Sequence, residues 1–410
     1  MSRKRKNKIS ECCDILDNLR VPINDEIRQN MQGNIPYYGA NGIQGYIDKY
    51  IFDEELILLA EDGGNFEEYH SRPIAYKIRG KSWVNNHAHI LRAKHEFNQD
   101  YIFYSLVHKD ITKYLNSGTR SKLNKSELEK IEIEFPSTKD EEDKIAHILS
   151  TCDTVIDKTQ SAIAKYKAIK QGMLHDLFTR GIDIKTGKLR PHYEEKPELY
   201  KESKLGWIPR EWQEKVFGKE VDLIHGHQFR DYDFTEFGIP VVKIGQVKPE
   251  NVDLSNCSFV ANGREDEFQN EIIQNGDVLM ALTGATLGKA CLVKGLNSIV
   301  LQNYRVGRFE PIVKENDIDK EFLYYLLIGG DLLIQIFNKV NTGAQGNIGK
   351  ADFEKAIFKK PPFEEQKQIA ARLKAIDNKL QTEQTYLQKM QQLKKGLMED
   401  LLSGSKRVKV

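Results

Sequence analysis

The stretch "EEDKIAHILSTCDTVIDK", residues Glu141–Lys158, is repeated in altered form as "EQKQIAARLKAIDNKLQT", residues Glu365–Thr382. Ile145 aligns with Ile369 at an offset of 224 residues (369 − 145), and the alignment runs without a gap to the ends "KQGMLHDLFTRG" and "KKGLMEDLLSGS". A repeat of this length bears on the whole fold, so it is interpreted before any single motif. It indicates that the chain consists of two related halves.

Both copies have apolar residues at alternating spacings of four and three, the heptad pattern of a coiled coil. The residues that define the two seams are Ile145, Leu149, Ile156 and Ile163 in the first copy and Ile369, Leu373, Leu380 and Leu387 in the second. Both copies place a polar residue, Thr159 or Glu383, at the same d position. Two seams of equal length in one chain predict two long helices that pair antiparallel. The alternative is two amphipathic helices packed on separate cores.

A globular segment precedes each helix, and both segments order their motifs alike: a Gly-rich strand, an "NNH" or "QNY" strand, a helix, a Gly loop, a short helix and a Pro-terminated strand. The stretches "QDYIFYSLVHKDITKYL" and "KEFLYYLLIGGDLLIQIFN" are predicted to be the helices. The expected fold class is α+β, with two similar mixed α/β domains, two long helices and a pseudo-two-fold internal repeat. The predicted boundaries are 1–136 for the first domain, 137–180 for the first helical spacer, 181–204 for a linker, 205–361 for the second domain and 362–403 for the second helical spacer.

Composition favours a cytoplasmic protein. The 410 residues contain no apolar run of membrane-spanning length, and the basic N-terminus is followed by no apolar signal region. Five cysteines without paired spacing fit a reducing compartment and argue against a zinc site. The net charge is only +1, so any basic surface for nucleic acid must be local.

The sequence contains no convincing catalytic motif. "GATLGKA" has three residues between its glycines where a phosphate loop has four, and it fits a hairpin turn better. "KPPF" has Lys360 where a methyltransferase motif needs a hydrogen-bond acceptor, and its prolines suit a helix start. His87 and His89 alternate on a strand with no third ligand nearby. We therefore expect a non-catalytic chain with no cofactor and no metal.

The remaining chemistry is recognition by polar loops. Arg reads guanine, and Asn or Gln reads adenine, through paired hydrogen bonds in the major groove, while Lys and Arg position a domain on phosphates. A surface or turn role is as good an interpretation for any single residue. The candidate DNA contacts are Tyr37, Tyr38, Asn85, Asn86, His87, Arg120 and Lys122 in the first domain, and His227, Gln228, Arg230, Gln302, Asn303, Arg305, Gln345 and Asn347 in the second.

In their order along the chain, "IPYYGANG", "LLAEDGG", "NNHAHILR", "GWIPREW" and "PPFEEQKQIAARLKAID" resemble the specificity subunit of type I restriction–modification systems. The resemblance covers nearly the whole chain. It implies that each domain reads one half of a split, asymmetric site in double-stranded DNA. It also implies that the helix pair sets the gap between the half-sites and docks two methyltransferase subunits, which restriction translocase–nuclease subunits then join.

Two other functions remain open at this point. The chain could be the specificity subunit of a related restriction–modification system that cleaves on both sides of its site. From a different class, it could be a coiled-coil scaffold whose globular domains bind proteins. Sequence-specific DNA binding with a steep salt dependence would distinguish a DNA-recognition subunit from the scaffold.

Overall fold

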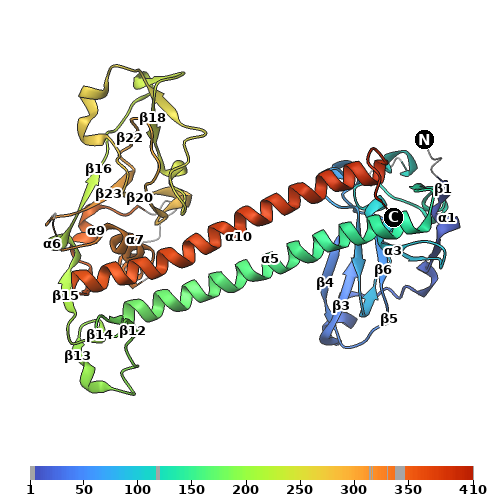
Figure 1. Cartoon of the computed structure of the whole chain (residues 1–410), viewed down its shortest axis with the longest axis horizontal. Helices are drawn as coiled ribbons and strands as arrows, with labels where there is room; N and C mark the ends of the chain where they lie inside the picture. The colour runs from blue at the N-terminus through green and yellow to red at the C-terminus, as the bar shows by residue number, and fades with distance from the viewer. Residues whose placement is uncertain are drawn as a thin grey trace. The chain divides into compact units, whose positions relative to one another are not determined.

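The protein divides into two compact units, and the division cuts both long helices. The first unit comprises Met1–Ala162 and Glu383–Val410, and the second comprises Ile163–Thr382. Each unit therefore holds the start of one long helix and the end of the other, of α5 (Lys139–Thr179) and α10 (Phe363–Ser403) (Figure 1). The computed structural model describes residues 5–116, 121–313, 315, 317–329, 331–337 and 347–409.

The strands of the first unit form two four-stranded sheets and a two-stranded ladder. They are β1 (Arg5–Lys8), β2 (Cys13–Ile15), β3 (Gln32–Gly39), β4 (Gly42–Ile47), β5 (Phe52–Asp53), β6 (Leu56–Ala60), β7 (Ala75–Ile78), β8 (Lys81–Val84), β9 (Ala88–Ala93) and β10 (Glu132–Phe135). Their order is β2-β9-β6-β7 in one sheet, β4-β3-β8-β5 in the other and β1-β10 in the ladder. Only the β3–β8 pair among these ladders is parallel. Strand β6 reads "LILLA" and is buried at every position, as its continuous apolar run predicts.

The second unit repeats one four-stranded sheet and the ladder and varies the other sheet. Its strands are β15 (Gln213–Val216), β16 (Val221–His225), β17 (Phe234–Thr235), β18 (Ile239–Val242), β19 (Ser258–Val260), β20 (Val278–Ala281), β21 (Ala290–Leu292), β22 (Leu301–Gln302), β23 (Val306–Pro311) and β24 (Ile357–Lys360). They form the sheets β16-β23-β20-β21 and β17-β19-β18-β22 and the ladder β15-β24. One pair, β18–β22, is again parallel, but it lies at the edge of its sheet, because the fourth strand, β17, pairs with β19. The α+β fold class and the internal repeat are confirmed.

The two predicted domain helices are present, but one is shorter than predicted and the other is divided in two. The short helices are α1 (Ile9–Cys12), α2 (Asp25–Gln29), α3 (Gln99–Val107), α4 (Lys125–Leu128), α6 (Phe217–Glu220), α7 (Lys320–Ile328), α8 (Asp331–Phe337) and α9 (Lys350–Glu354). The first predicted helix ends with α3, and the chain then turns so that Ile111 enters the core with no exposed surface. The second is divided into α7 and α8 beside Gly329, because glycine is a poor helix former.

In the first unit, the start of α5 pairs with the end of α10 in antiparallel orientation. Glu141 contacts Arg407 at 2.5 Å, just beyond the end of α10, and Asp153 forms an ion pair with Lys394, so partner numbers fall along α10 as they rise along α5. The hydroxyl of Tyr104 on α3 donates to Asp153 at 2.6 Å, and the Lys394 ammonium lies 5.3 Å from the Tyr104 ring centroid. This Tyr–Asp–Lys contact fastens the globular part to both long helices.

The second unit contains the same antiparallel contacts at the repeat offset. Lys170 lies 2.5 Å from Asp377, and the backbone amide of Ile182 donates to Glu365 at 2.7 Å. The hydroxyl of Tyr325 on α7 donates to Asp377 at 2.9 Å, and the Lys170 ammonium lies 5.8 Å from that ring centroid. Burial raises the pKa of the Tyr325 hydroxyl, which remains a donor. Each globular part is thus held by an equivalent triad.

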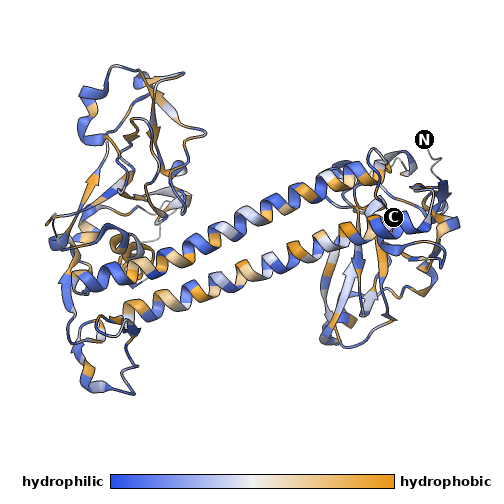
Figure 2. Cartoon of the chain, viewed as in Figure 1, coloured by the Kyte–Doolittle hydropathy of each residue, from blue (hydrophilic) through white to orange (hydrophobic). Residues whose placement is uncertain are grey.

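The heptad seam is buried as predicted. Apolar and polar positions intermix along both helices (Figure 2). Leu387 is half-buried, and the other seam residues are buried, namely Ile145, Leu149, Ile156, Ile163, Ile369, Leu373 and Leu380. Near the helix starts the seam joins the domain cores, where Ile145 packs with Leu401, and Ile369 with Leu177. Among the described residues, we found no helix with the length and apolar character needed to span a bilayer.

The stretch predicted as a linker is folded into the second unit. It contains a hairpin of β11 (Ile182–Asp183) and β12 (Lys188–Leu189), followed by β13 (Tyr200–Ser203), which pairs with β14 (Gly206–Pro209). Trp207 on β14 is 44% exposed and stacks on Tyr193 at 4.2 Å between ring centroids. Residues 181–204 therefore form part of a domain edge.

A buried ion pair anchors this stretch to the start of α10. Arg190 is 7% exposed and binds the fully buried Glu365 with both terminal nitrogens, at 2.5 and 3.0 Å. The indole nitrogen of Trp212, also fully buried, donates to the same carboxylate at 3.0 Å. Gly181, with φ +62°, ends α5 here, and a Cβ at this position would lie 2.2 Å from Glu365 Oε1. Glycine is needed both for the left-handed turn and for the space.

Candidate nucleic-acid interface

Three loops of the first unit meet beside its sheets. They are the β3–β4 turn, the loop after β6 and the β8–β9 loop, which contains Asn85, Asn86 and His87. The Asn85 amide donates to Tyr38 O at 2.9 Å, and the Glu61 amide donates to His87 O at 2.9 Å, so backbone bonds tie the loops together. The loops enclose a cleft of about 380 Å³, lined by Ala40, Asn41, Gly42, Ile43, Gln44, Asp62, Gly63 and His87.

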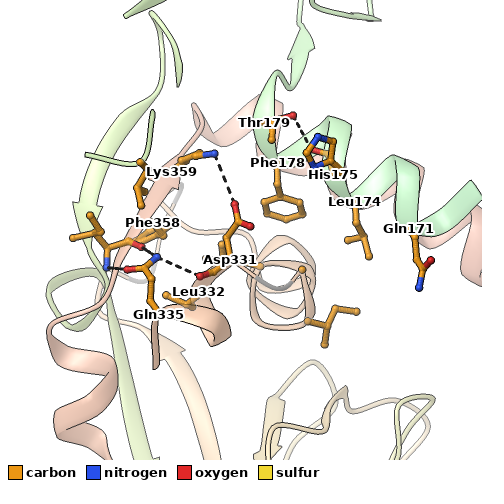
Figure 3. Close-up of a pocket in the computed structure, with 15 residues that line it drawn as sticks. Gln171, Leu174, His175, Phe178, Thr179, Asp331, Leu332, Gln335, Phe358 and Lys359 are labelled. Atoms are coloured by element: carbon orange, nitrogen blue, oxygen red, sulfur yellow. Dashed lines mark hydrogen bonds and ion pairs between the residues drawn. The ribbon is translucent and has the colours of Figure 1, made fainter. Parts of the chain in front are cut away.

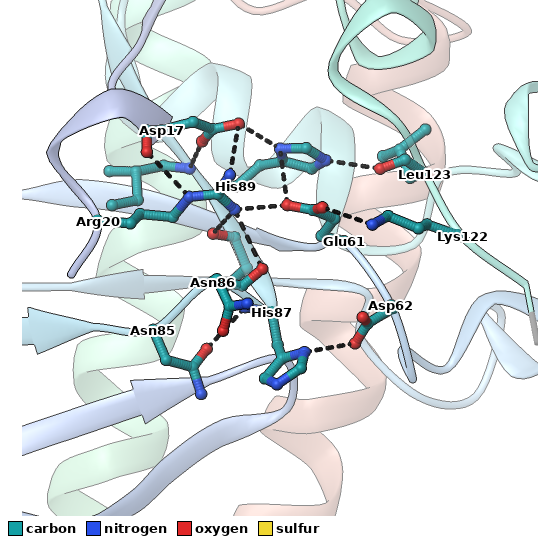
Figure 4. A network of polar contacts seen from close by, with 12 residues as sticks. Asp17, Arg20, Glu61, Asp62, Asn85, Asn86, His87, His89, Lys122 and Leu123 are labelled. Carbon is teal, nitrogen blue, oxygen red and sulfur yellow. Dashed lines mark hydrogen bonds and ion pairs between the residues drawn. The ribbon is translucent and has the colours of Figure 1, made fainter. Parts of the chain in front are cut away.

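Asn85 connects two residues that line the cleft, Gln44 and His87. Its side chain is buried, its carbonyl accepts the His87 amide at 2.8 Å, and its amide group donates to Gln44 at 3.0 Å. Nδ1 of His87 lies 2.8 Å from Oδ1 of Asp62, and 43% of the His87 side chain is exposed (Figure 4). The loop therefore presents an imidazole whose orientation is set by two neighbours.

A buried histidine, His89, lies on β9 next to the β8–β9 loop. His89 is 1% exposed, with Nδ1 2.6 Å from Asp17 Oδ2 and Nε2 2.8 Å from the Leu123 carbonyl oxygen (Figure 4). Both ring nitrogens therefore lie within hydrogen-bonding distance of an oxygen atom, which fixes the orientation of the ring. Burial by itself raises the pKa of the Asp17 carboxyl, but the contacts with His89, the Ile90 amide and Arg20 together outweigh it, and the pKa lies below its usual value.

Arg20 connects the carboxylates next to His89 to the β8–β9 loop. Its guanidinium lies 2.5 Å from Glu61 and donates to the carbonyl oxygens of Asn86 at 3.3 Å and Ala88 at 3.1 Å. Lys122 approaches the second oxygen of Glu61 at 3.1 Å. Because both cations share one carboxylate, the network holds the β8–β9 loop against the segment containing Lys122 (Figure 4).

The donor atoms of Asp17, Glu61 and His89 lie within 4.8 Å of one another, a spacing that could hold a metal ion. Both carboxylates, however, already pair with a guanidinium, and Glu61 also pairs with an ammonium. The set is therefore satisfied as an ion-pair network. His87 takes no part in it, since its ring contacts Asp62.

The second unit contains an equivalent loop between β22 and β23, with the apolar Leu282 in the place of Glu61. The Asn303 amide donates to Val242 O at 3.1 Å, its side chain accepts the Arg305 amide at 3.3 Å, and the Leu282 amide donates to Arg305 O at 3.0 Å. These hydrogen bonds match those of the first unit. Asn303 corresponds to Asn85, Arg305 to His87, and Leu282 to Glu61. Gly307 replaces His89, and a Cβ there would lie 3.1 Å from Leu282.

The predicted DNA contacts fall into three groups by exposure. Those exposed are Asn86, Lys122, His227, Gln228, Arg230, Arg305 and Asn347, those half-buried are Tyr38 and His87, and those buried are Tyr37, Asn85, Gln302 and Asn303. Arg120 and Gln345 lie outside the described residues. Gln302 has no exposed surface and donates to the carbonyl oxygens of Ile224 and Val306. We assign the four buried residues to loop support, because a buried side chain cannot reach a base edge.

Sequence reasoning missed the residues that organise this site. Asp62 orients His87, and Arg20 joins Glu61, a residue 41 positions away in the chain. Asp62 follows the buried strand β6 in "AEDGG", so a carboxylate at a strand end was the one available signal. The Arg20–Glu61 pair had no local signal at all.

A second cavity, of about 390 Å³, lies in the second unit away from these loops (Figure 3). Leu174 and Phe178 on α5, Leu332 on α8 and Phe358 on β24 form much of its apolar lining. Burial lowers the pKa of the Lys359 amine at its wall, and the carboxylate of Asp331 lies 3.8 Å away. None of the predicted DNA contacts that the structure describes lines this cavity.

Comparison with known proteins agrees with this architecture. The MjaVIII type I restriction enzyme specificity subunit of Methanocaldococcus jannaschii is 29% identical over 401 residues, spanning 93% of this chain and 88% of that protein. The crystal structure of a type I restriction–modification S subunit from M. genitalium covers 98% of this chain and 96% of its own, with a TM-score of 0.66 and 16% identity. A chain from a type I system structure concerned with complex assembly and conformational transition covers 97% of each, with a TM-score of 0.52 and 13% identity. At these identities the two structures show a shared fold.

A family model matches both halves of the repeat. The model of the type I restriction modification DNA specificity domain matches residues 1–166 and 222–392, one block for each half. The matched blocks contain both recognition loops and most of both long helices. The chain belongs to the family of type I restriction–modification DNA specificity subunits.

Proposed function

We propose that each unit reads one half of a split, asymmetric site in double-stranded DNA. The observation that carries this proposal is the duplicated loop, which has the same backbone hydrogen bonds in both units. The two loops differ in the side chain at the equivalent position, which is the half-buried His87 in one unit and the exposed Arg305 in the other. Since imidazole and guanidinium recognise different base edges, the two half-sites should differ in sequence.

The exposed cations beside the loops suit phosphate contacts. Lys122 borders the first loop, and Arg230 is an exposed residue of the second unit. Such contacts fix the orientation of a domain on the duplex and make binding salt-dependent, although they carry no base information. The proposed interface therefore combines a base-reading loop with a phosphate-binding rim in each unit.

The two long helices would serve as the spacer and the docking surface. Their contacts repeat at an offset of 224 residues, so the chain presents each helix surface twice and could bind two copies of one methyltransferase subunit. Restriction translocase–nuclease subunits would join that core, and the partners would supply the catalysis in the cytoplasm. The chain itself would be non-catalytic.

Methylation mapping tests this proposal. The chain is co-expressed with its methyltransferase partner in a host without DNA methylation, and modified bases are located by sequencing. The expected result is a split motif with a fixed gap and adenines methylated on opposite strands. An assembled complex that methylates no split motif would refute the proposal.

A further inference from the structure

One position in each recognition loop is equivalent in the two units and carries a different side chain. His87 follows Asn85 by two residues, as Arg305 follows Asn303, and the backbone amide of each donates a hydrogen bond to the side-chain oxygen of that Asn. The carbonyl oxygen of each then accepts the amide at the end of the neighbouring central strand, from Glu61 or Leu282. The two side chains therefore leave the backbone at the same place.

The hydrogen-bonding character of His87 is set by its partner. An ionised carboxylate only accepts hydrogen bonds, so the Nδ1 atom that lies 2.8 Å from Asp62 carries the ring hydrogen. In the neutral ring Nε2 then has a lone pair and acts as an acceptor. Within the described residues Nε2 makes no hydrogen bond to protein, and 43% of the side chain is exposed. The first unit thus offers an outward acceptor.

Arg305 offers the opposite character. Its Nε donates to the hydroxyl of Tyr304 at 2.6 Å, and its guanidinium carbon lies 5.2 Å from the Tyr304 ring centroid. These contacts hold the guanidinium plane, and in the described part of the chain its two terminal nitrogens have no protein partner. A guanidinium has no acceptor, so the second unit offers a fork of outward donors.

We propose that His87 and Arg305 are equivalent specificity-determining residues with opposite base preference. His87 accepts a hydrogen bond from the amino group of adenine or cytosine, and Arg305 donates two hydrogen bonds to O6 and N7 of guanine. Asp62 acts as a positioning residue because it selects the His87 tautomer. This inference rests on the proposed function, in which each loop reads its own half-site.

Reciprocal substitution with methylation mapping of the full complex tests the inference. His87→Arg should change one position of one half-site from adenine or cytosine to guanine, by on the order of tenfold in preference, and leave the other half-site unchanged. Arg305→His alone should lose the guanine preference, because the guanidinium is gone. It should not gain a preference for adenine or cytosine, because Thr283 stands where Asp62 stands in the first unit and cannot fix the tautomer in the same way. Arg305→His with Thr283→Asp should create a preference for adenine or cytosine.

Asp62→Ala separates a positioning role from a structural one. Without the carboxylate the ring can donate or accept, so discrimination should relax at the His87 position alone, while a structural defect would weaken binding to every sequence equally. A wild-type complex without a split motif would overturn both the proposed function and this inference. A wild-type split motif that His87→Arg leaves unaltered would overturn the inference alone.

Discussion

The buried Arg190–Glu365 pair allows a quantitative test of how the second unit is held together. Glu365→Gln keeps the shape of the side chain but removes its charge. The Arg190 guanidinium, 7% exposed, then keeps only the exposed carboxylate of Glu211, 3.6 Å away, as a counter-ion. Breaking such a buried pair costs about 3–5 kcal/mol, because the remaining buried charge loses its closest counter-ion. We expect the free energy of unfolding of the second unit to fall by about that amount, a large share of the stability of an ordinary domain.

The first unit provides a matched control at the same repeat position. Glu141 precedes Glu365 by 224 residues and also binds an arginine, Arg407. The Arg407 side chain is 55% exposed, so water can solvate its charge after Glu141→Gln. The same substitution should therefore cause only a small fraction of the loss. The substituted residue and its place on the helix are the same, so the comparison reports the buried surroundings of Glu365: its buried arginine and the hydrogen bonds from Trp212 and Ile182.

Urea titration of the full-length protein measures both effects. Trp212 contacts Glu365 and should report the second unit, whereas Trp83 lies in the first unit, and each transition is fitted separately. A loss for Glu365→Gln no larger than for Glu141→Gln would refute the reasoning. Arg190→Met combined with Glu365→Gln should recover part of the stability, because no unpaired charge remains.

Three further predictions concern the first unit, the triads and the helices. The folded pKa of Asp17 is lowered, so its stabilisation is present above about pH 4 and is lost as the pH falls through the folded pKa; Asp17→Asn should flatten this acid limb in thermal unfolding, and an unchanged limb would contradict the assignment. Asp153→Asn and Asp377→Asn remove equivalent acceptors, so each should destabilise its own unit by about 1–2 kcal/mol in hydrogen exchange, and an effect in one unit only would argue against equivalent triads. Inserting one heptad into each long helix adds about 10 Å, so methylation mapping should show a gap wider by about three base pairs, and a changed half-site would contradict the spacer role.

Much of the fold follows from local patterns in the sequence. The heptad spacing predicted both long helices, since a 3.6-residue turn places such positions on one face. The "GATLGKA" stretch was predicted to be a hairpin turn, and it connects the antiparallel strands β20 and β21. "KPPF" was predicted to start a helix, and α10 begins at Phe363. These features depend on neighbouring residues, which the sequence displays directly.

The candidate site was predictable by region but not by residue. The "NNH" and "QNY" stretches were identified as recognition loops from their polar composition, yet Asn85 and Asn303 point inward and support the backbone. Composition cannot distinguish a loop side chain that bonds its own backbone from one that faces solvent. The orientation of His87 depends on Asp62, which approaches from another strand.

The sequence by itself determined the duplication, the two helical seams and the order of elements in each half, because each is a periodic or local property of the chain. Only the tertiary structure decided which side chains meet across long separations, such as Arg190 and Glu365, 175 positions apart. It also decided that the β8–β9 loop of the first unit contacts the Arg20–Glu61 ion pair, whereas the equivalent loop of the second unit contacts Leu282. The reason is physical: the partner of a buried charge is set by the packing of distant strands and helices, and no local pattern encodes it.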